Sequence, residues 1–141
     1  MSLRGEPRRD PPRLTGMHRL HIKRVYDAPE ASDGIRVLVD RLWPRGLSKE
    51  QARINHWLKD VAPSNALRQW FGHDINRWKE FQYRYLDELA PPNETISQLR
   101  ELMKGHPVTL LYSARSETHN NAVVLMAFLK RPKKRNSTTT S

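Results

Sequence analysis

The stretch that decides the fold of this chain is Gly34-Ile-Arg-Val-Leu-Val-Asp-Arg-Leu-Trp-Pro-Arg-Gly-Leu47. Its apolar run, Ile35 to Val39, predicts a buried strand over roughly residues 35–42, ended by Pro44. The residues that follow the run include one acid, two arginines and an indole: Asp40, Arg41, Trp43 and Arg45. A core strand that leads at once into charged side chains predicts a functional site rather than a plain turn.

Length and composition predict a small protein with one domain. The 141 residues suffice for one hydrophobic core but not for two ordinary domains. Cysteine is absent, which excludes disulfides, thiol catalysis and Cys-ligated metals. No N-terminal apolar segment follows the early arginines, and the longest apolar run, Ala122 to Leu129, is too short to span a bilayer. We therefore expect a soluble cytoplasmic protein without a membrane partner.

The net charge of +10 is concentrated at the two ends of the chain. Residues 1–24 and 130–141 each carry a net charge of +5, whereas residues 25–129 contain 13 basic and 13 acidic side chains. Low apolar content predicts disordered basic tails at 1–17 and 131–141, around an α/β domain at 18–130. Such tails can attract nucleic acid without reading its sequence, or they can simply aid solubility.

Further strands are predicted at residues 20–26 and 108–113, separated from the strand at 35–42 by turn residues and by helical segments. The apolar character of the strand at 35–42 is typical of a strand covered on both faces. Strands and helices in alternation favour a small single α/β domain with a short, largely parallel sheet, of about three or more strands, flanked by helices.

Capping residues and apolar spacing predict the helices. Ser48 and Gln51 form a capping box, and Ile54, Trp57, Leu58 and Val61 continue at helical spacing. A short helix follows Ser64 and stops at Gly72. Three more helices are predicted, behind Asp74 over about residues 75–90, behind Asn93 up to Gly105, and over about residues 120–130.

The predicted site lies where two strands end. Ligands of open α/β sheets collect outside the carboxyl ends of the strands, and the strand at 108–113 leads into a second polar loop, Ser113-Ala-Arg-Ser-Glu-Thr-His-Asn-Asn121. This loop precedes a helix N-terminus, where free amide groups favour an anion. If the two strands are adjacent and parallel, Arg41, Arg45 and Arg115 could converge on one carboxylate or phosphate.

Several of these residues also have a structural interpretation. Arg41 could pair with Asp40, Trp43 could belong to the core, and Asn120 or Asn121 could only cap the helix. Ser113 has no Gly-x-Ser-x-Gly context for a nucleophile. His119 is a candidate acid or base beside Glu117, with Asp40 as the other catalytic candidate. The candidate ligand-binding residues are Arg41, Trp43, Arg45, Ser113, Arg115, His119, Asn120 and Asn121.

The histidines do not predict a metal site. His18 and His21 lie near the N-terminal tail without an acidic partner, and the other four are scattered along the chain. No His-x-x-x-His helix, P-loop or Gly-x-Gly-x-x-Gly motif is present. We therefore expect neither a metal nor a cofactor.

Three motifs give the chain a family resemblance. Val39-Asp-Arg-Leu-Trp-Pro-Arg-Gly46, Trp57-Leu-Lys-Asp-Val-Ala-Pro-Ser64 and Leu110-Leu-Tyr-Ser-Ala-Arg115, the last followed by His119-Asn120, resemble the YeaO-like branch of the domain of unknown function 488 family. The resemblance covers about residues 20–130 and implies a compact α/β domain without an assigned activity.

Two departures from the wider family accompany this resemblance. Wider relatives have a longer helical crossover at the position of Asp27 to Gly34, and Cys-His-Arg at the position of Asn120-Asn121-Ala122. Cys- or His-centred chemistry of those relatives is therefore not expected at residues 120–122.

Two classes of function remain open. The first is binding of an anionic small molecule, a nucleotide or phosphorylated metabolite, at the loops 40–46 and 113–121, with or without chemistry. The second is a nucleic-acid-binding or interaction module that uses the basic tails and the Arg/Trp loop. Salt dependence distinguishes them, because removal of the tails flattens a steep salt dependence of nucleic-acid binding and leaves the affinity of a pocket ligand unchanged.

Overall fold

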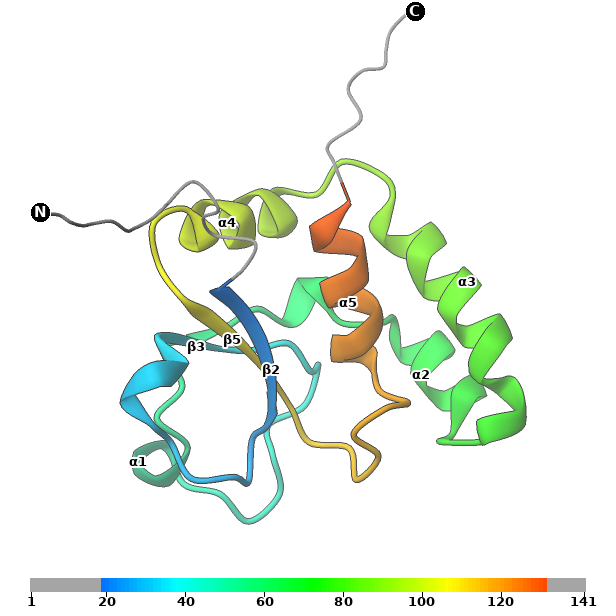
Figure 1. Ribbon diagram of the computed structural model, residues 1–141. Helices are drawn as coiled ribbons and strands as arrows, with labels where there is room; N and C mark the ends of the chain where they lie inside the picture. The colour runs from blue at the N-terminus through cyan, green and yellow to red at the C-terminus, as the bar shows by residue number, and fades with distance from the viewer. Residues whose placement is uncertain (1–18, 132–141) are drawn as a thin grey trace, which may run out of the picture.

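The protein forms a four-stranded sheet whose strand pairs are all parallel. The computed structural model describes residues 19–131. The strand order is β2 (Leu20–Arg24), β5 (Val108–Tyr112), β3 (Ile35–Leu38) and β4 (His56–Trp57). β5 therefore lies between β2 and β3, as Figure 1 shows. The predicted fold class, a small α/β domain with a parallel sheet, is confirmed.

The predicted strands are present with shorter bounds. β3 ends at Leu38 rather than near residue 42, and β2 ends at Arg24. All five residues of β5 are buried, because this strand has a neighbour on each edge and packing on each face. Its register places Leu110 opposite Ile22 of β2 and Val37 of β3.

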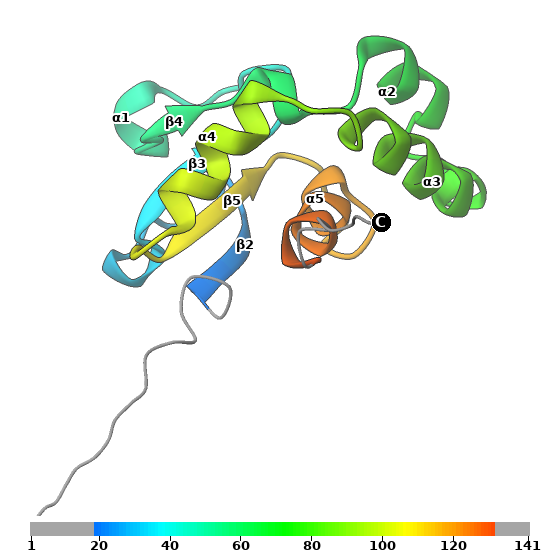
Figure 2. The same cartoon turned by 90° about the horizontal axis from the view of Figure 1, so that it is seen from above.

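One face of the sheet carries the main hydrophobic core. Val37 of β3 and Leu110 of β5 pack there against the apolar sides of the helices. These helices are α2 (Asn65–Phe71), α3 (Trp78–Leu89), α4 (Glu94–Met103) and α5 (Asn121–Lys130). Figure 2 shows α2 and α3 at one end of the molecule and α1 (Lys49–Ala52) at the other.

The opposite face of the sheet has a smaller core. Val25, Leu38 and Leu111 are buried there, and Trp43 and Trp57 pack against them. The segment after β3 covers this face instead of a long helix. Alternation along β3 thus sends Val37 toward the helices and Leu38 toward this smaller cluster.

The short helix predicted after Ser48 is present, but the helical spacing of Ile54, Trp57, Leu58 and Val61 does not correspond to an α-helix. α1 ends at Ala52, and Arg53 adopts a left-handed conformation. The guanidinium of Arg36 donates hydrogen bonds to the carbonyl oxygens of Ala52 (2.7 Å from Nη2) and Arg53 (3.1 Å from Nε), so the last carbonyls of α1 have a partner outside the helix. The chain then pairs with β3 as β4, and Lys59–Val61 forms a 3-10 turn.

The predicted caps are largely confirmed. Ser48 and Gln51 form the capping box of α1, and the Ser64, Asn93 and Asn120 side chains accept hydrogen bonds from the first turns of α2, α4 and α5. Asp74 caps a 3-10 turn, Ile75–Arg77, which leads directly into α3. The predicted tails lie outside the described residues, except for Arg131. Among residues 19–131, no helix combines the length and apolar character needed to cross a membrane.

Candidate functional site

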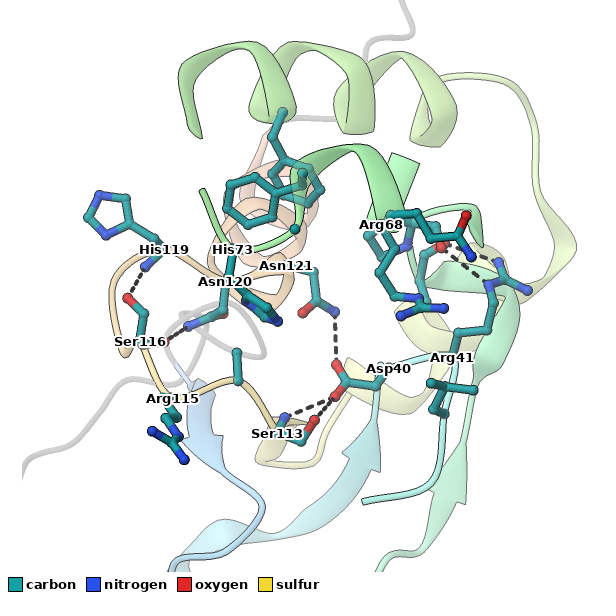
Figure 3. Close-up of a pocket in the computed structure, with 18 of the residues that line it drawn as sticks. Asp40, Arg41, Arg68, His73, Ser113, Arg115, Ser116, His119, Asn120 and Asn121 are labelled. Atoms are coloured by element: carbon teal, nitrogen blue, oxygen red, sulfur yellow. Dashed lines mark hydrogen bonds between the residues drawn. The ribbon is translucent and has the colours of Figure 1, made fainter. Parts of the chain in front are cut away.

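A cavity of about 830 Å³ opens at the carboxyl ends of β3 and β5. The loops after these two strands form two of its walls, and the C-terminal end of α2 with the turn that follows forms a third. Figure 3 shows this arrangement around Asp40. Every candidate residue predicted from sequence lines this cavity: Asp40, Arg41, Trp43, Arg45, Ser113, Arg115, His119, Asn120 and Asn121.

Asp40 is held in place by the residue after β5 and by the first residue of α5. Its Oδ2 accepts hydrogen bonds from the backbone nitrogen (2.9 Å) and the hydroxyl (2.7 Å) of Ser113. Its Oδ1 accepts one from Nδ2 of Asn121 (3.1 Å). Asn121 also donates to the carbonyl oxygen of Val39 (2.9 Å), so the start of α5 is tied to the end of β3. Ser113 and Asn121 therefore fix the carboxyl group rather than stand free in the cavity.

The pKa of Asp40 is raised above its ordinary value of 3.8, chiefly because burial disfavours the charged form. The hydrogen bonds from Ser113 and Asn121 and the nearby His73 oppose this rise. No salt bridge among the described residues includes Asp40. The cavity thus contains a partly buried carboxyl group without a paired cation.

Arg41 is oriented by the backbone rather than by Asp40. Its Nε donates to the carbonyl oxygen of Pro63 (3.2 Å), and its Nη2 is 3.4 Å from that of Ala62. Within residues 19–131 no salt bridge joins Arg41 to Asp40, the pairing that the sequence left open. Since these two contacts use only part of the guanidinium, the remaining N–H groups are available to a ligand.

The arginines are distributed on two sides of the cavity. Figure 3 shows Arg41 and Arg68 on one side of Asp40 and Arg115 on the other. Arg45 also lines the cavity, and its carbonyl oxygen accepts a hydrogen bond from the Tyr26 hydroxyl (2.8 Å). Arg41 and Arg115 therefore do not point at one common atom, and Arg68 is the cation that shares a side with Arg41.

Trp43 is anchored toward the smaller core. Its Nε1 donates to the carbonyl oxygen of Leu47 (2.6 Å), and its ring meets Trp57 edge-on, 5.4 Å between centroids. Trp57 in turn donates to the carbonyl oxygen of Asp40 (2.8 Å). The two indoles therefore brace the loop that carries Asp40 and Arg41.

The loop after β5 has mainly structural hydrogen bonds. Asn120, 2% exposed, accepts from the backbone nitrogen of Val123 (3.0 Å) and donates to the carbonyl oxygen of Ser116 (2.9 Å). The Nδ1 atom of His119 lies 2.7 Å from the Thr118 hydroxyl, and its ring stands edge-on to Trp78. Asn120 is thus the cap of α5, and His119 has neighbours other than Glu117.

Sequence reasoning missed the third wall of the cavity. Arg68 lies on α2, and His73 follows the Gly72 that ends this helix. Both Gly72 and His73 have positive φ angles, 52° and 58°, which turn the chain back toward the cavity. The stop at Gly72 was visible in the sequence, but no local pattern shows that the end of α2 meets the end of β3.

No metal centre is evident in the described part of the chain. Among residues 19–131, no three His, Asp or Glu side chains lie close enough together to hold a metal ion. What the cavity offers instead is a set of guanidinium groups around one carboxyl group.

The fold and the site define a small α/β protein with a cavity at the carboxyl ends of a parallel sheet. Residues 19–141 match the model of the family DUF488-N3i, described as the inactive DUF488-N3 subclade. The chain therefore belongs to this family, which confirms the resemblance found in the sequence.

Individual relatives support the same membership. The chain is 43% identical over 111 residues to uncharacterized protein YeaO of Escherichia coli (strain K12), covering 79% of this chain and 96% of the relative. It is 40% identical over 111 residues to uncharacterized protein Rv3073c of Mycobacterium tuberculosis (strain ATCC 25618 / H37Rv), covering 79% of this chain and 93% of the relative. No solved structure gives a significant match.

Proposed function

We propose that the protein binds an anionic small molecule, a nucleotide or phosphorylated metabolite, in the cavity at the ends of β3 and β5. The observation that carries the proposal is the charge of the lining. Arg41, Arg45, Arg68 and Arg115 line the cavity, and Asp40 is the one acidic residue among the described residues that line it. None of these arginines takes part in a salt bridge among the described residues. Unpaired guanidinium groups in a concave site favour a phosphate or carboxylate.

The charged end of the ligand is assigned to the side of the cavity that holds Arg41 and Arg68. The carbonyl oxygens of Pro63 and Ala62 orient the Arg41 side chain before any ligand arrives. A pre-oriented guanidinium loses less conformational entropy when it binds an anion. Each guanidinium is planar and can donate two parallel hydrogen bonds, so two of them on one side of the cavity suit a phosphate group.

The size of the cavity supports a ligand larger than a bare anion. A volume of about 830 Å³ falls within the range of about 300–1,000 Å³ that holds small organic molecules. Phe71 and Ile75 contribute apolar surface to the lining. The proposed ligand therefore has an organic body as well as a charged group.

Binding without catalysis agrees best with the polar groups of the site. The two catalytic candidates already have partners within the protein: Asp40 accepts hydrogen bonds from Ser113 and Asn121, and Nδ1 of His119 lies 2.7 Å from the Thr118 hydroxyl. The description of the family as an inactive subclade points the same way. We therefore assign the cavity to ligand binding rather than to a reaction.

The test is calorimetric titration of the full chain with sulfate and with adenosine 5′-monophosphate (AMP). Arg41→Gln and Arg68→Gln should each weaken binding about tenfold or more, because each removes a charged hydrogen-bond donor. Arg53→Gln is the matched control, since Arg53 is exposed and does not line the cavity. Equal affinities in all three variants and the wild type would refute the proposal.

A further inference from the structure

We propose that Asp40 selects the ligand, and that the ligand is a hydroxylated phosphate ester, a sugar phosphate or nucleoside phosphate, with a hydroxyl group that donates to Asp40. This inference rests on the proposed function of the cavity. It adds a requirement that the arginines do not impose: the anion must also carry a hydrogen-bond donor.

The hydrogen bonds of Asp40 leave one acceptor position open. Oδ2 accepts from both the nitrogen and the hydroxyl of Ser113, whereas Oδ1 accepts only from Asn121. A carboxylate oxygen has two lone pairs. Since Asp40 lines the cavity, a ligand hydroxyl or amino group can take the remaining position on Oδ1.

The charge of Asp40 also acts against simple anions. No salt bridge within residues 19–131 neutralises it, although four arginines line the same cavity. An anion in the cavity is exposed to the carboxylate of Asp40 as well as to the guanidinium groups, since all of them line it. A donor-free anion gains from the guanidinium groups but is repelled by Asp40, whereas an anion with a nearby hydroxyl gains from both. Selectivity of this kind uses a repulsive group against the wrong ligand.

The position of Asp40 limits the ligand further. Because Arg41 and Arg68 lie on one side of Asp40 in the same cavity (Figure 3), the ligand must present a charged group to the arginines and a donor to the carboxylate. Hydroxyl and phosphate groups are close neighbours in a sugar phosphate. The apolar surface from Phe71 and Ile75 then provides room for an attached ring, as a nucleoside would require.

The experiment compares sulfate, ribose 5-phosphate and AMP on the wild-type chain and on Asp40→Asn. Sulfate has no donor, and the two phosphate esters carry hydroxyl groups. The wild type should prefer the esters to sulfate, and Asp40→Asn should reduce that preference about ten- to a hundredfold, the range for a hydrogen bond to a charged group. Asp87→Asn, which removes an exposed carboxylate of α3 outside the cavity, should leave the preference unchanged.

A second measurement does not depend on the folding of a variant. On the wild-type chain, 2′,3′-dideoxyadenosine 5′-monophosphate should bind about tenfold more weakly than AMP, because it lacks both ribose hydroxyls. If ribose 5-phosphate binds like AMP, the sugar phosphate is the recognised part. If only AMP binds tightly, the nucleoside contributes as well. Both outcomes support a hydroxylated phosphate ester.

The remaining outcomes separate the two proposals. If sulfate binds through Arg41 and Arg68 but the esters bind no better than sulfate, or if Asp40→Asn keeps the wild-type preference, the role of Asp40 is refuted and anion binding stands. If none of the three compounds binds at millimolar concentration, the proposed function is refuted together with this inference.

Discussion

The two ends of strand β3 each carry an aspartate, but the two aspartates have opposite surroundings. At the amino end, Asp33 is 5% exposed and contacts two cations, Arg36 (2.6 Å) and Lys23 (3.0 Å). At the carboxyl end, Asp40 has neutral donors, Ser113 and Asn121, and lines a cavity. The comparison teaches that Asp33 is held by paired cations inside the structure, whereas Asp40 has no paired cation among the described residues and faces a cavity.

The pKa values follow the same contrast. Burial alone would raise the pKa of Asp33, but hydrogen bonds from the Glu30 nitrogen, Lys23 and Arg36 outweigh burial and lower it below 3.8. For Asp40, burial dominates and the pKa is raised. For Asp33 the hydrogen bond from the Glu30 nitrogen lowers the pKa most and the two cations add to it, whereas the hydrogen bonds to Asp40 do not outweigh its burial.

Replacement of Asp33 should have the largest effect on stability. Asp33→Asn leaves Arg36, 4% exposed, without its counter-charge and leaves Lys23 with Glu30 as its remaining acidic partner. Loss of one partner from a buried ion pair costs about 3–5 kcal/mol of the free energy of unfolding. Asp40→Asn should change this free energy by less than about 1 kcal/mol, since one lost hydrogen bond opposes the relief of burying a charge. Guanidinium denaturation followed by tryptophan fluorescence measures both, and equal losses would contradict the comparison.

Replacement of two glycines, Gly34 directly before β3 and Gly46 in the loop after it, should give the next largest difference in stability. Gly34 has φ 66°, and a Cβ there would overlap the Pro107 carbonyl oxygen, which accepts the hydrogen bond of Ile35. Gly34→Ala should therefore lower the free energy of unfolding by about 3 kcal/mol, from steric overlap and backbone strain together. Gly46 has φ 77°, but a Cβ at this position would have no atom within 4 Å, so Gly46→Ala should cost about 1 kcal/mol. Similar losses of stability for the two variants in thermal denaturation would contradict the expectation that the chain is packed more tightly at Gly34 than at Gly46.

The smallest expected effect is a difference in pH dependence. Because the folded state raises the pKa of Asp40, the stability linked to this group is fully present below about pH 3.8 and is lost as the pH rises through the raised value. The free energy of unfolding of Asp40→Asn should therefore fall less than that of the wild type over this interval.

The pH dependence of stability that is linked to Asp33 has the opposite sign. Its lowered pKa contributes stability above pH 3.8 that is lost as the pH falls through the lowered value. Denaturation curves of the wild type and the two variants across the acidic range test both signs, and parallel curves for all three proteins would contradict them.

The strongly patterned elements were predictable from the sequence. Asn93 with the apolar spacing behind it predicted α4, and the apolar runs predicted β3 and β5. The caps and strand cores depend on residues close together in the chain, so a local pattern suffices to find them. The sequence left open whether these two strands are adjacent and parallel, and their pairing in the structure brings together the two loops that form two walls of the cavity.

The parts of the fold and of the cavity that the sequence did not predict depend on contacts between residues far apart in the chain. β4 has only two residues, His56–Trp57, too few to show the alternation of a strand. The helix before it, α1, ends at Ala52, whose carbonyl oxygen accepts a hydrogen bond from the distant Arg36. Arg68 and His73 reach the cavity because α2 packs beside the sheet end, and no local pattern records that packing. Two walls of the cavity could therefore be predicted from the strands, whereas the third wall, at the end of α2, could not.

The position of β5 has a consequence for synthesis of the chain. β5 joins β2 to the pair formed by β3 and β4, yet it is the last of the four strands to leave the ribosome. Until residues 108–112 emerge, the earlier strands present open edges, which favour aggregation and chaperone binding. A nascent chain halted before Val108 should therefore be degraded rapidly, whereas one halted after Lys130 already contains every strand and helix found in residues 19–131.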